Sequence, residues 1–253
     1  MAGMIATRCS IGSVSEQPSV APFASWRPQR FGRVRATKVV DPLIEPLWIG
    51  ERVLAHVDRT PAAPSVAIVD GAGRTIDPAG PGDELSRLHA GIERAVRADG
   101  AVIDGYLTRQ ATQPSVGQFL EVSTARTSTA VRRLFLGESA GRRAQAVREE
   151  SREAAERLAA DGAPLAFVAI DLLSLDGAPL LDVPLLERKR LLDSTVEPDE
   201  LVRVGPYVRL PAERWYGTWR SAGFVEIALK AANGRYRPGE ESDSWATLAI
   251  PRR

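Results

Sequence analysis

The stretch FVAIDLLSLDGAPLLDVPLLERKRLL, residues 167–192, decides the fold of this chain. It begins inside the run LAFVAIDLLSL (165–175), which is apolar enough to form a strand buried on both faces. Asp176-Gly177 is a turn signal, and Pro184 suits the start of a short helix over PLLERKRLL (184–192). The stretch therefore predicts a core strand, a tight turn and a helix in succession.

The sequence on either side mixes strand patterns with helix patterns. Strands are predicted at 52–58, 65–69, 101–108 and 224–231, and helices at 84–97 and 142–160. Asp70-Gly71 is a turn signal after the second of these strands, and Asp99-Gly100 and Asp161-Gly162 end the two helices. This mixture predicts a protein of the α/β or the α+β class.

Composition excludes several classes of protein. The 253 residues are 44% hydrophobic and 26% charged, and the net charge is +1. The single cysteine, Cys9, excludes a disulfide scaffold, and the two histidines, His56 and His89, cannot build a multi-histidine metal site. No apolar stretch approaches the ~18 residues of a membrane helix, and the N-terminus lacks a secretory signal. We therefore expect a cytoplasmic protein without metal ligands and without membrane contact.

The first 40 residues differ from the rest in charge. They contain six cations and one acid, a net charge of +5, and their first 25 residues are rich in Ser, Ala and Pro without periodicity. We expect residues 1–40 to be a basic, disordered leader and residues 41–253 to form one domain. The segment WRPQRFGRVRATK (26–38) combines cations with aromatics, as in segments that bind nucleic acid. An ordinary solubilising tail is the other interpretation.

Four segments, in order along the chain, resemble the adenylation domain of ATP-dependent DNA ligases. Residues 167–192 are similar to the family pattern "vaFDLLyLDGxdLrxlPLxERKxLL", and FVEIALKAANGRYRPGEESDSWATL (224–248) is similar to "EGvVlKxxdsxYxpGxRsxxWxKxK". IEPLWIGERVLAHVD (44–58) lies where the family has its nucleophile motif "xEpKxDGxRxxxhxd", and VIDGYL (102–107) lies where it has "vlDGEl".

This resemblance implies an α+β nucleotidyltransferase fold, in which two antiparallel-rich sheets with flanking helices enclose a cleft. No segment resembling the OB-fold domain of complete ligases follows. In the family, a lysine amine attacks the α-phosphate of ATP and forms a lysyl-AMP, which is covalent catalysis by phosphoryl transfer. That chemistry needs carboxylates for a divalent metal, cations for the triphosphate and an aromatic ring for the adenine.

Carried over residue by residue, the motifs have lost their chemical groups. The family's lysine corresponds to Leu47 and its aspartate to Ile49, while the glutamates of the DGE and EG motifs correspond to Tyr106 and Val225. We therefore predict no catalytic residue, no metal site and no cofactor. Four other positions are candidate nucleotide contacts: Glu45, Arg52, Ile170 and Lys230. For Arg52 and Lys230, pairing with local carboxylates is an equal alternative.

The resemblance and the losses together give one leading hypothesis and two alternatives. The leading hypothesis is a ligase-family adenylation domain that has lost lysyl-AMP formation and acts as a binding module for nucleic acid or protein. The first alternative is an active ATP-dependent DNA ligase or nucleotidyltransferase in DNA repair, with a non-standard nucleophile or a partner chain, and only this alternative needs ATP and Mg²⁺. The second is a structural partner of a separate active ligase, using the apolar cleft or the helix at 142–160.

Overall fold

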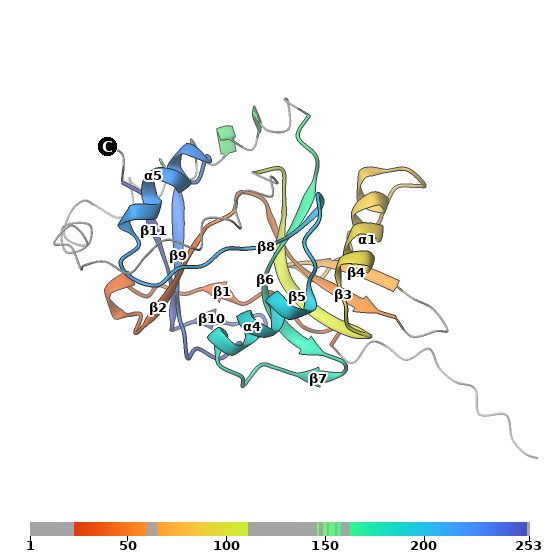
Figure 1. Cartoon of the computed structure of the whole chain (residues 1–253), viewed down its shortest axis with the longest axis horizontal. Coiled ribbons are helices and arrows are strands. Elements are labelled where there is room, and N and C mark those ends of the chain that lie inside the picture. The colour runs from red at the N-terminus through yellow and green to blue at the C-terminus, as the bar shows by residue number, and fades with distance from the viewer. Residues whose placement is uncertain are drawn as a thin grey trace, which may run out of the picture.

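The computed structural model describes residues 23–59, 65–110, 146, 149–150, 152–154, 156–157 and 162–251. Two main β-sheets lie side by side, with helices flanking them (Figure 1). The fold is therefore α+β with two antiparallel-rich sheets, as predicted. None of the helices in the described ranges is long and apolar enough to cross a membrane.

The larger sheet has six strands in the order β4-β3-β5-β6-β7, and β8 pairs with β6. Its strands are β3 (Glu51–Asp58), β4 (Ser65–Asp70), β5 (Gly100–Thr108), β6 (Ala166–Leu175), β7 (Ala178–Pro179) and β8 (Val202–Val204). All pairs are antiparallel except β6 with β8. Nine of the ten residues of β6 are buried, which confirms the prediction of a strand with two buried faces. The turn to β7 is made by Asp176 and Gly177, both with positive φ.

The smaller sheet has three antiparallel strands in the order β11-β9-β2. They are β2 (Pro42–Pro46), β9 (Glu226–Ala231) and β11 (Trp245–Ala249). A separate parallel pair joins β1 (Arg30–Phe31) to β10 (Glu241–Ser242). The chain passes from the smaller sheet to the larger one between β2 and β3, so residues 47–50 lie at the junction of the two sheets.

The helices bury apolar faces against these sheets. They are α1 (Glu84–Ala95), α4 (Leu185–Thr195), α5 (Glu213–Ser221) and the short 3-10 helix η1 (Ala36–Lys38). In α1, Leu88 and Ile92 enter the core of the larger sheet, and the Asp83 side chain caps the first turn. The cap before α4 is Pro184, as predicted, so the first backbone amides of α4 bond elsewhere, from Leu185 to Gly234 and from Leu186 to Ala232.

The predicted helix at 142–160 lies largely outside the described residues. Within it, residues 146, 149–150, 152–154 and 156–157 are helical. Arg220 of α5 forms an ion pair with Glu150 at 2.9 Å, so this segment contacts the smaller-sheet half of the molecule.

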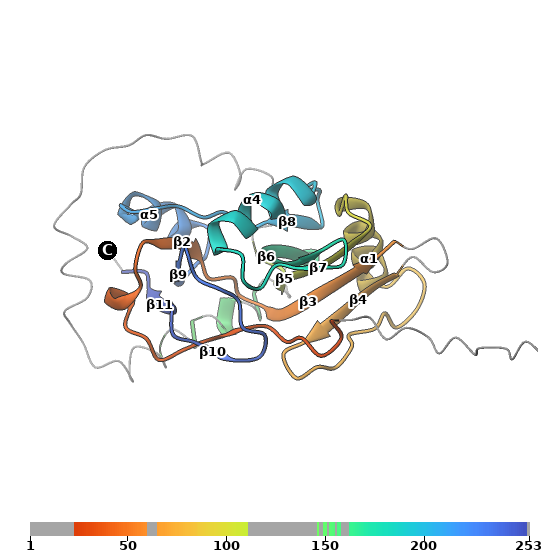
Figure 2. The same cartoon turned by 90° about the horizontal axis from the view of Figure 1, so that it is seen from below.

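The N-terminal segment differs from the disordered leader that the sequence suggested. From Phe23 onward it packs against the domain, and Gln29 is only 1% exposed. Phe23, Trp26 and Phe31 lie on an apolar cluster that includes Leu54 and Trp245. Figure 2 shows this segment and β10 on the side of the molecule opposite α4 and α5. The aromatic residues among the cations have an apolar sheet face to cover, and the packed domain therefore starts before residue 41.

Candidate functional site

The crossover of residues 47–50 is held tightly between the two sheets. The Leu47 amide donates to the Glu226 carbonyl at 2.9 Å, and the Ile49 amide donates to the side-chain oxygen of Gln110 at 2.9 Å. A Cβ at Gly50 would lie 2.0 Å from the Leu107 carbonyl oxygen, so only glycine allows this close approach. The position assigned to the nucleophile is therefore fixed at the junction, and it carries the side chain of Leu47.

Three of the predicted motif positions meet in one apolar cluster. Tyr106 and Ile170 are buried there, beside Trp48 and Phe224, and Leu47 packs against the cluster. Trp48 and Phe224 form an edge-to-face pair with their ring centroids 4.8 Å apart. At this junction the two sheets are held together by hydrocarbon and aromatic contacts.

The remaining motif positions border the same junction. Val225 is buried and precedes Glu226, whose carbonyl accepts the Leu47 amide. On β11 (Trp245–Ala249), Thr247 lies opposite Ala228 of β9. The structure thus brings these positions together in space, although none of them supplies an amine or a carboxylate side chain.

On β11, Ala249 lies opposite Glu226 of β9, two residues beyond Thr247 along the strand. These are the two positions at which the family pattern has alternating lysines, and here both side chains are uncharged. These two positions of β11, on the edge of the smaller sheet opposite β2, therefore offer no cation to a triphosphate.

Arg52 on β3 is committed to a carboxylate. Its guanidinium donates two hydrogen bonds to Asp104 of β5, from Nε at 2.9 Å and from Nη2 at 2.5 Å, and the Tyr236 hydroxyl donates to the same carboxylate at 2.7 Å. The guanidinium also lies 5.1 Å from the ring centroid of Trp245 and 5.8 Å from that of Tyr106. Burial alone would lower the pKa of Arg52, but the Asp104 carboxylate raises it well above its usual value. The sequence left Arg52 as either a nucleotide contact or the partner of a local carboxylate, and in the structure it is paired with Asp104.

Lys230 is likewise paired, in a buried cluster with Glu45 and Lys189. The Glu45 carboxylate lies 2.9 Å from Nζ of Lys230 and 2.9 Å from Nζ of Lys189, and no side chain of the three is more than 4% exposed. The Lys230 ammonium also lies 4.5 Å from the ring centroid of Trp245. Burial would raise the pKa of Glu45, but the two lysines lower it below its usual value, whereas burial lowers the pKa of Lys230.

Lys189 is the member of this cluster that sequence reasoning missed as a site residue. In the sequence, Lys189 is distinguished only as part of the ERK run (187–189). Its neighbours Arg188 and Arg190 have different environments. Arg188 is buried and bonds both oxygens of Asp171 at 2.8 Å, whereas Arg190 is exposed and pairs with Glu187. The position of Lys189 on the buried face of α4 could have indicated that it is a site residue. Its partner could not be identified, because Glu45 lies far away in the sequence.

The side chains of this site do not fit a divalent metal or a triphosphate. The oxygens of Asp104 accept bonds from Arg52 and Tyr236, and those of Glu45 face two lysines. Among the described residues, no three His, Cys, Asp or Glu side chains are grouped so that they could hold a metal ion. Hard divalent cations need several free oxygen ligands, which the carboxylates here do not offer.

The fold of the two sheets is shared with solved structures of DNA ligases. The structure of "mycobacterial DNA ligase D complexed with ATP and MES" superposes with a TM-score of 0.55 and 19% identity, over 89% of this chain and 60% of that chain. The ligase domain of LigD from M. tuberculosis superposes with a TM-score of 0.53 and 19% identity, over 89% of this chain and 59% of that one. The chain therefore has the nucleotidyltransferase fold of ligase adenylation domains.

Sequence comparisons point to the same class of protein. Residues 132–248 match the model of the ATP dependent DNA ligase domain. A DNA ligase of Methanothrix thermoacetophila is 34% identical over 88 residues, and DNA ligase 2 of Methanosarcina acetivorans is 31% identical over 94 residues. Each match spans only 16% of the length of that relative. Residues 132–248 are therefore similar to the ATP dependent DNA ligase domain, and the whole chain spans only a small part of the curated relatives it matches.

Proposed function

We propose that this domain has lost lysyl-AMP formation and acts as a nucleic-acid-binding module. The observation that carries the proposal is the position of Leu47 at the junction of the sheets, with the nearby lysines Lys189 and Lys230 already paired with Glu45. A hydrocarbon side chain has no lone pair with which to attack a phosphorus atom. Under this proposal, the loss of lysyl-AMP formation at this position is therefore complete and does not depend on pH.

Replacement of the nucleophile by another lysine has little support from the geometry. Lys189 and Lys230 are 0% and 1% exposed, and each is held 2.9 Å from a Glu45 oxygen. An attacking amine has to reach the α-phosphate, and both lysine side chains are instead buried against the Glu45 carboxylate. Lys38 is exposed on η1, outside the buried junction.

Binding of nucleic acid is supported by the segment 26–38. Arg30, Arg33, Arg35 and Lys38 are exposed in this segment, close together along the chain. A group of exposed cations binds the phosphate backbone without regard to sequence, and such binding weakens steeply as salt rises. This surface does not depend on the lost catalytic groups, so it can persist in a domain that no longer reacts with ATP.

The two parts of the proposal have separate tests. In a sealing assay with ATP, Mg²⁺ and a 5′-phosphorylated nicked duplex, we expect no sealed strand at any protein concentration, while an active DNA ligase seals the same substrate. In a binding assay with the same duplex, we expect affinity that falls as salt rises and that is lost in a quadruple variant with glutamine at the four cation positions. Sealing by the wild type would contradict the first part, and unchanged binding by the quadruple variant would contradict the second.

A further inference from the structure

Residues 26–38, called the strap here, have an inner side that joins the two halves of the molecule. On this side, the Phe31 ring lies 5.6 Å from that of Trp245 in the smaller sheet and 5.7 Å from the Arg52 guanidinium in the larger sheet. The buried Gln29 amide donates to the Tyr236 hydroxyl at 2.8 Å, and the Gln29 side chain accepts from the Arg237 amide. The strap thus contacts both sheets on the side opposite α4.

The strap is seated by close backbone contact. The Arg30 amide donates to the Glu240 carbonyl and the Gly239 amide donates to the Arg27 carbonyl, both at 2.9 Å. A Cβ at Gly32 would lie 1.9 Å from the Ser242 carbonyl oxygen, which is a backbone atom that cannot move aside on its own. Any side chain at Gly32 would therefore push the strap away from β10.

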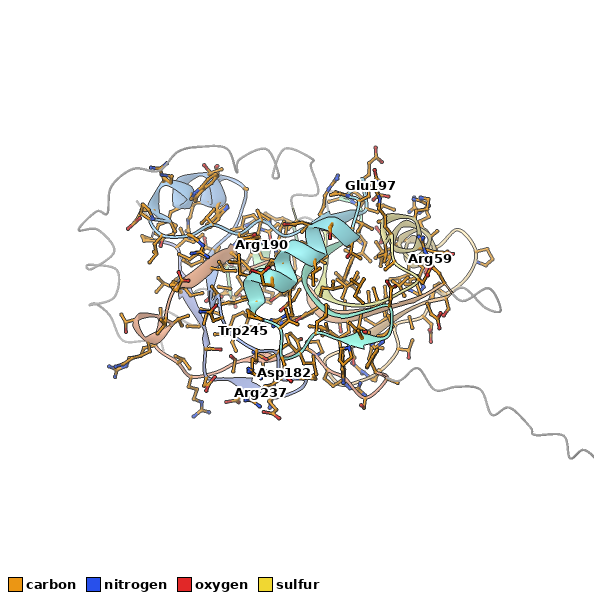
Figure 3. The ribbon with its side chains drawn as sticks, turned by 60° about the horizontal axis from the view of Figure 1, so that its bottom comes forward. Arg59, Asp182, Arg190, Glu197, Arg237 and Trp245 are labelled. Carbon is orange, nitrogen blue, oxygen red and sulfur yellow. The ribbon has the colours of Figure 1, made fainter. Side chains whose placement is uncertain are left out.

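The outer side of the strap carries exposed cations without acidic partners. Arg30, Arg33, Arg35 and Lys38 are exposed, and within the described part of the chain no ion pair involves any of them. Several exposed arginines elsewhere are paired, as Arg97 is with Glu197 and Arg190 is with Glu187. Figure 3 labels Glu197 and Arg190. Unneutralised cations gathered on one segment create a local positive potential that attracts a polyanion.

A pocket of about 420 Å³ continues this surface beyond η1. Its lining includes Lys38, Arg235 and Arg237 as well as the acids Asp41 and Asp243. Arg235 pairs with Asp182, whereas the Arg237 side chain is exposed with no ion-pair partner among the described residues. Figure 3 shows Arg237 at the edge of the molecule and Trp245 deeper between the sheets. Lys38 of the strap and Arg237 of the loop that holds Gln29 therefore border the same pocket.

We propose that the strap couples nucleic-acid binding to its own docking across the two sheets: its outer cations bind the sugar–phosphate backbone tightly only while its inner side is docked. This inference rests on the proposed binding function. Docking fixes the cations on a rigid surface beside Arg237, whereas an undocked strap would carry them on a loose chain. Only the docked form is then competent, so the apparent dissociation constant rises as the docked fraction falls. By reciprocity, bound nucleic acid stabilises the docked strap.

The test uses a pair of glycine substitutions in the full chain. Gly32→Ala removes no charge but clashes with β10, and Gly80→Ala is its matched control, because a Cβ there meets no atom within 4 Å. Amide hydrogen exchange of residues 26–34 measures docking, and exchange of β5 and β6 shows whether the domain stays folded. Fluorescence anisotropy with a labelled nicked duplex measures binding, and the double variant Arg33→Gln with Arg35→Gln serves as a second probe that leaves the inner side intact.

We expect Gly32→Ala to speed exchange in residues 26–34 and to weaken binding, roughly tenfold if one molecule in ten stays docked. Gly80→Ala should change neither readout, and saturating duplex should slow exchange of the wild-type strap. The arginine double variant should weaken binding while docking persists. If Gly32→Ala frees the strap and binding stays unchanged, the coupling is wrong although the binding function stands. If the wild type does not bind the duplex, both proposals fail.

Discussion

Buried ion pairs lie in two regions of the molecule, at Asp171–Arg188 and at the junction between the two sheets, and they are arranged differently. Arg188 bonds both oxygens of Asp171 at 2.8 Å and the Gly234 carbonyl at 3.2 Å, so α4, β6 and the loop after β9 are held together. At the junction, Asp104 pairs with Arg52. Glu45 pairs with both Lys189 and Lys230. The comparison teaches that Asp171 and Arg188 form a one-to-one pair, whereas the single carboxylate of Glu45 faces two buried lysines.

The largest effect is expected from the scaffold pair. Asp171→Ala leaves the Arg188 guanidinium buried without its carboxylate, and we expect the free energy of unfolding to fall by about 3–5 kcal/mol. Urea unfolding monitored by circular dichroism measures this. Glu187→Ala is the control, because it breaks the exposed pair with Arg190 on the same helix and should barely change the unfolding midpoint. Equal effects of the two substitutions would remove the distinction between scaffold and surface charge.

A smaller effect is expected from Glu45→Gln in the cleft. It leaves Lys189 and Lys230 buried without a counter-charge, and we expect a loss of about 3 kcal/mol at neutral pH. The folded-state pKa of Glu45 lies below its usual 4.5, so its stabilisation is present above pH 4.5 and is lost as the pH falls through the folded-state pKa. Unfolding of both forms across this range should therefore show their difference shrinking in acid. A difference that grows on acidification would contradict the pairing.

The smallest effect is expected from Tyr236→Phe. This substitution removes the hydroxyl that donates to Asp104 and accepts from the Gln29 amide, but it leaves the Arg52–Asp104 pair in place. We expect a loss of about 2 kcal/mol, because two hydrogen bonds of typically ~1 kcal/mol each are removed, and urea unfolding measures this. Hydrogen exchange should also quicken at Gln29. A loss as large as that of Asp171→Ala would mean that the strap contributes as much to the fold as the scaffold pair.

Local patterns made much of the fold predictable. The strand at 166–175, the turn at Asp176-Gly177 and the helix after Pro184 each follow from residues that are neighbours in the chain. The docking of the strap was not predictable, because Gln29 and Tyr236 meet only through the tertiary fold. For the same reason, the sequence left the roles of Arg52 and Lys230 open until their carboxylate partners were placed.

The most direct test of the account is the mass of the intact protein after incubation with ATP and Mg²⁺ or Mn²⁺. The unreacted mass is predicted under both conditions, because Leu47 lies where the resemblance places the nucleophile and the two lysines paired with Glu45 are buried. An active ligase adenylation domain treated in parallel should gain one AMP. A gain of one covalent AMP by this chain, on any lysine, would contradict the claim that its cleft has lost the adenylation chemistry.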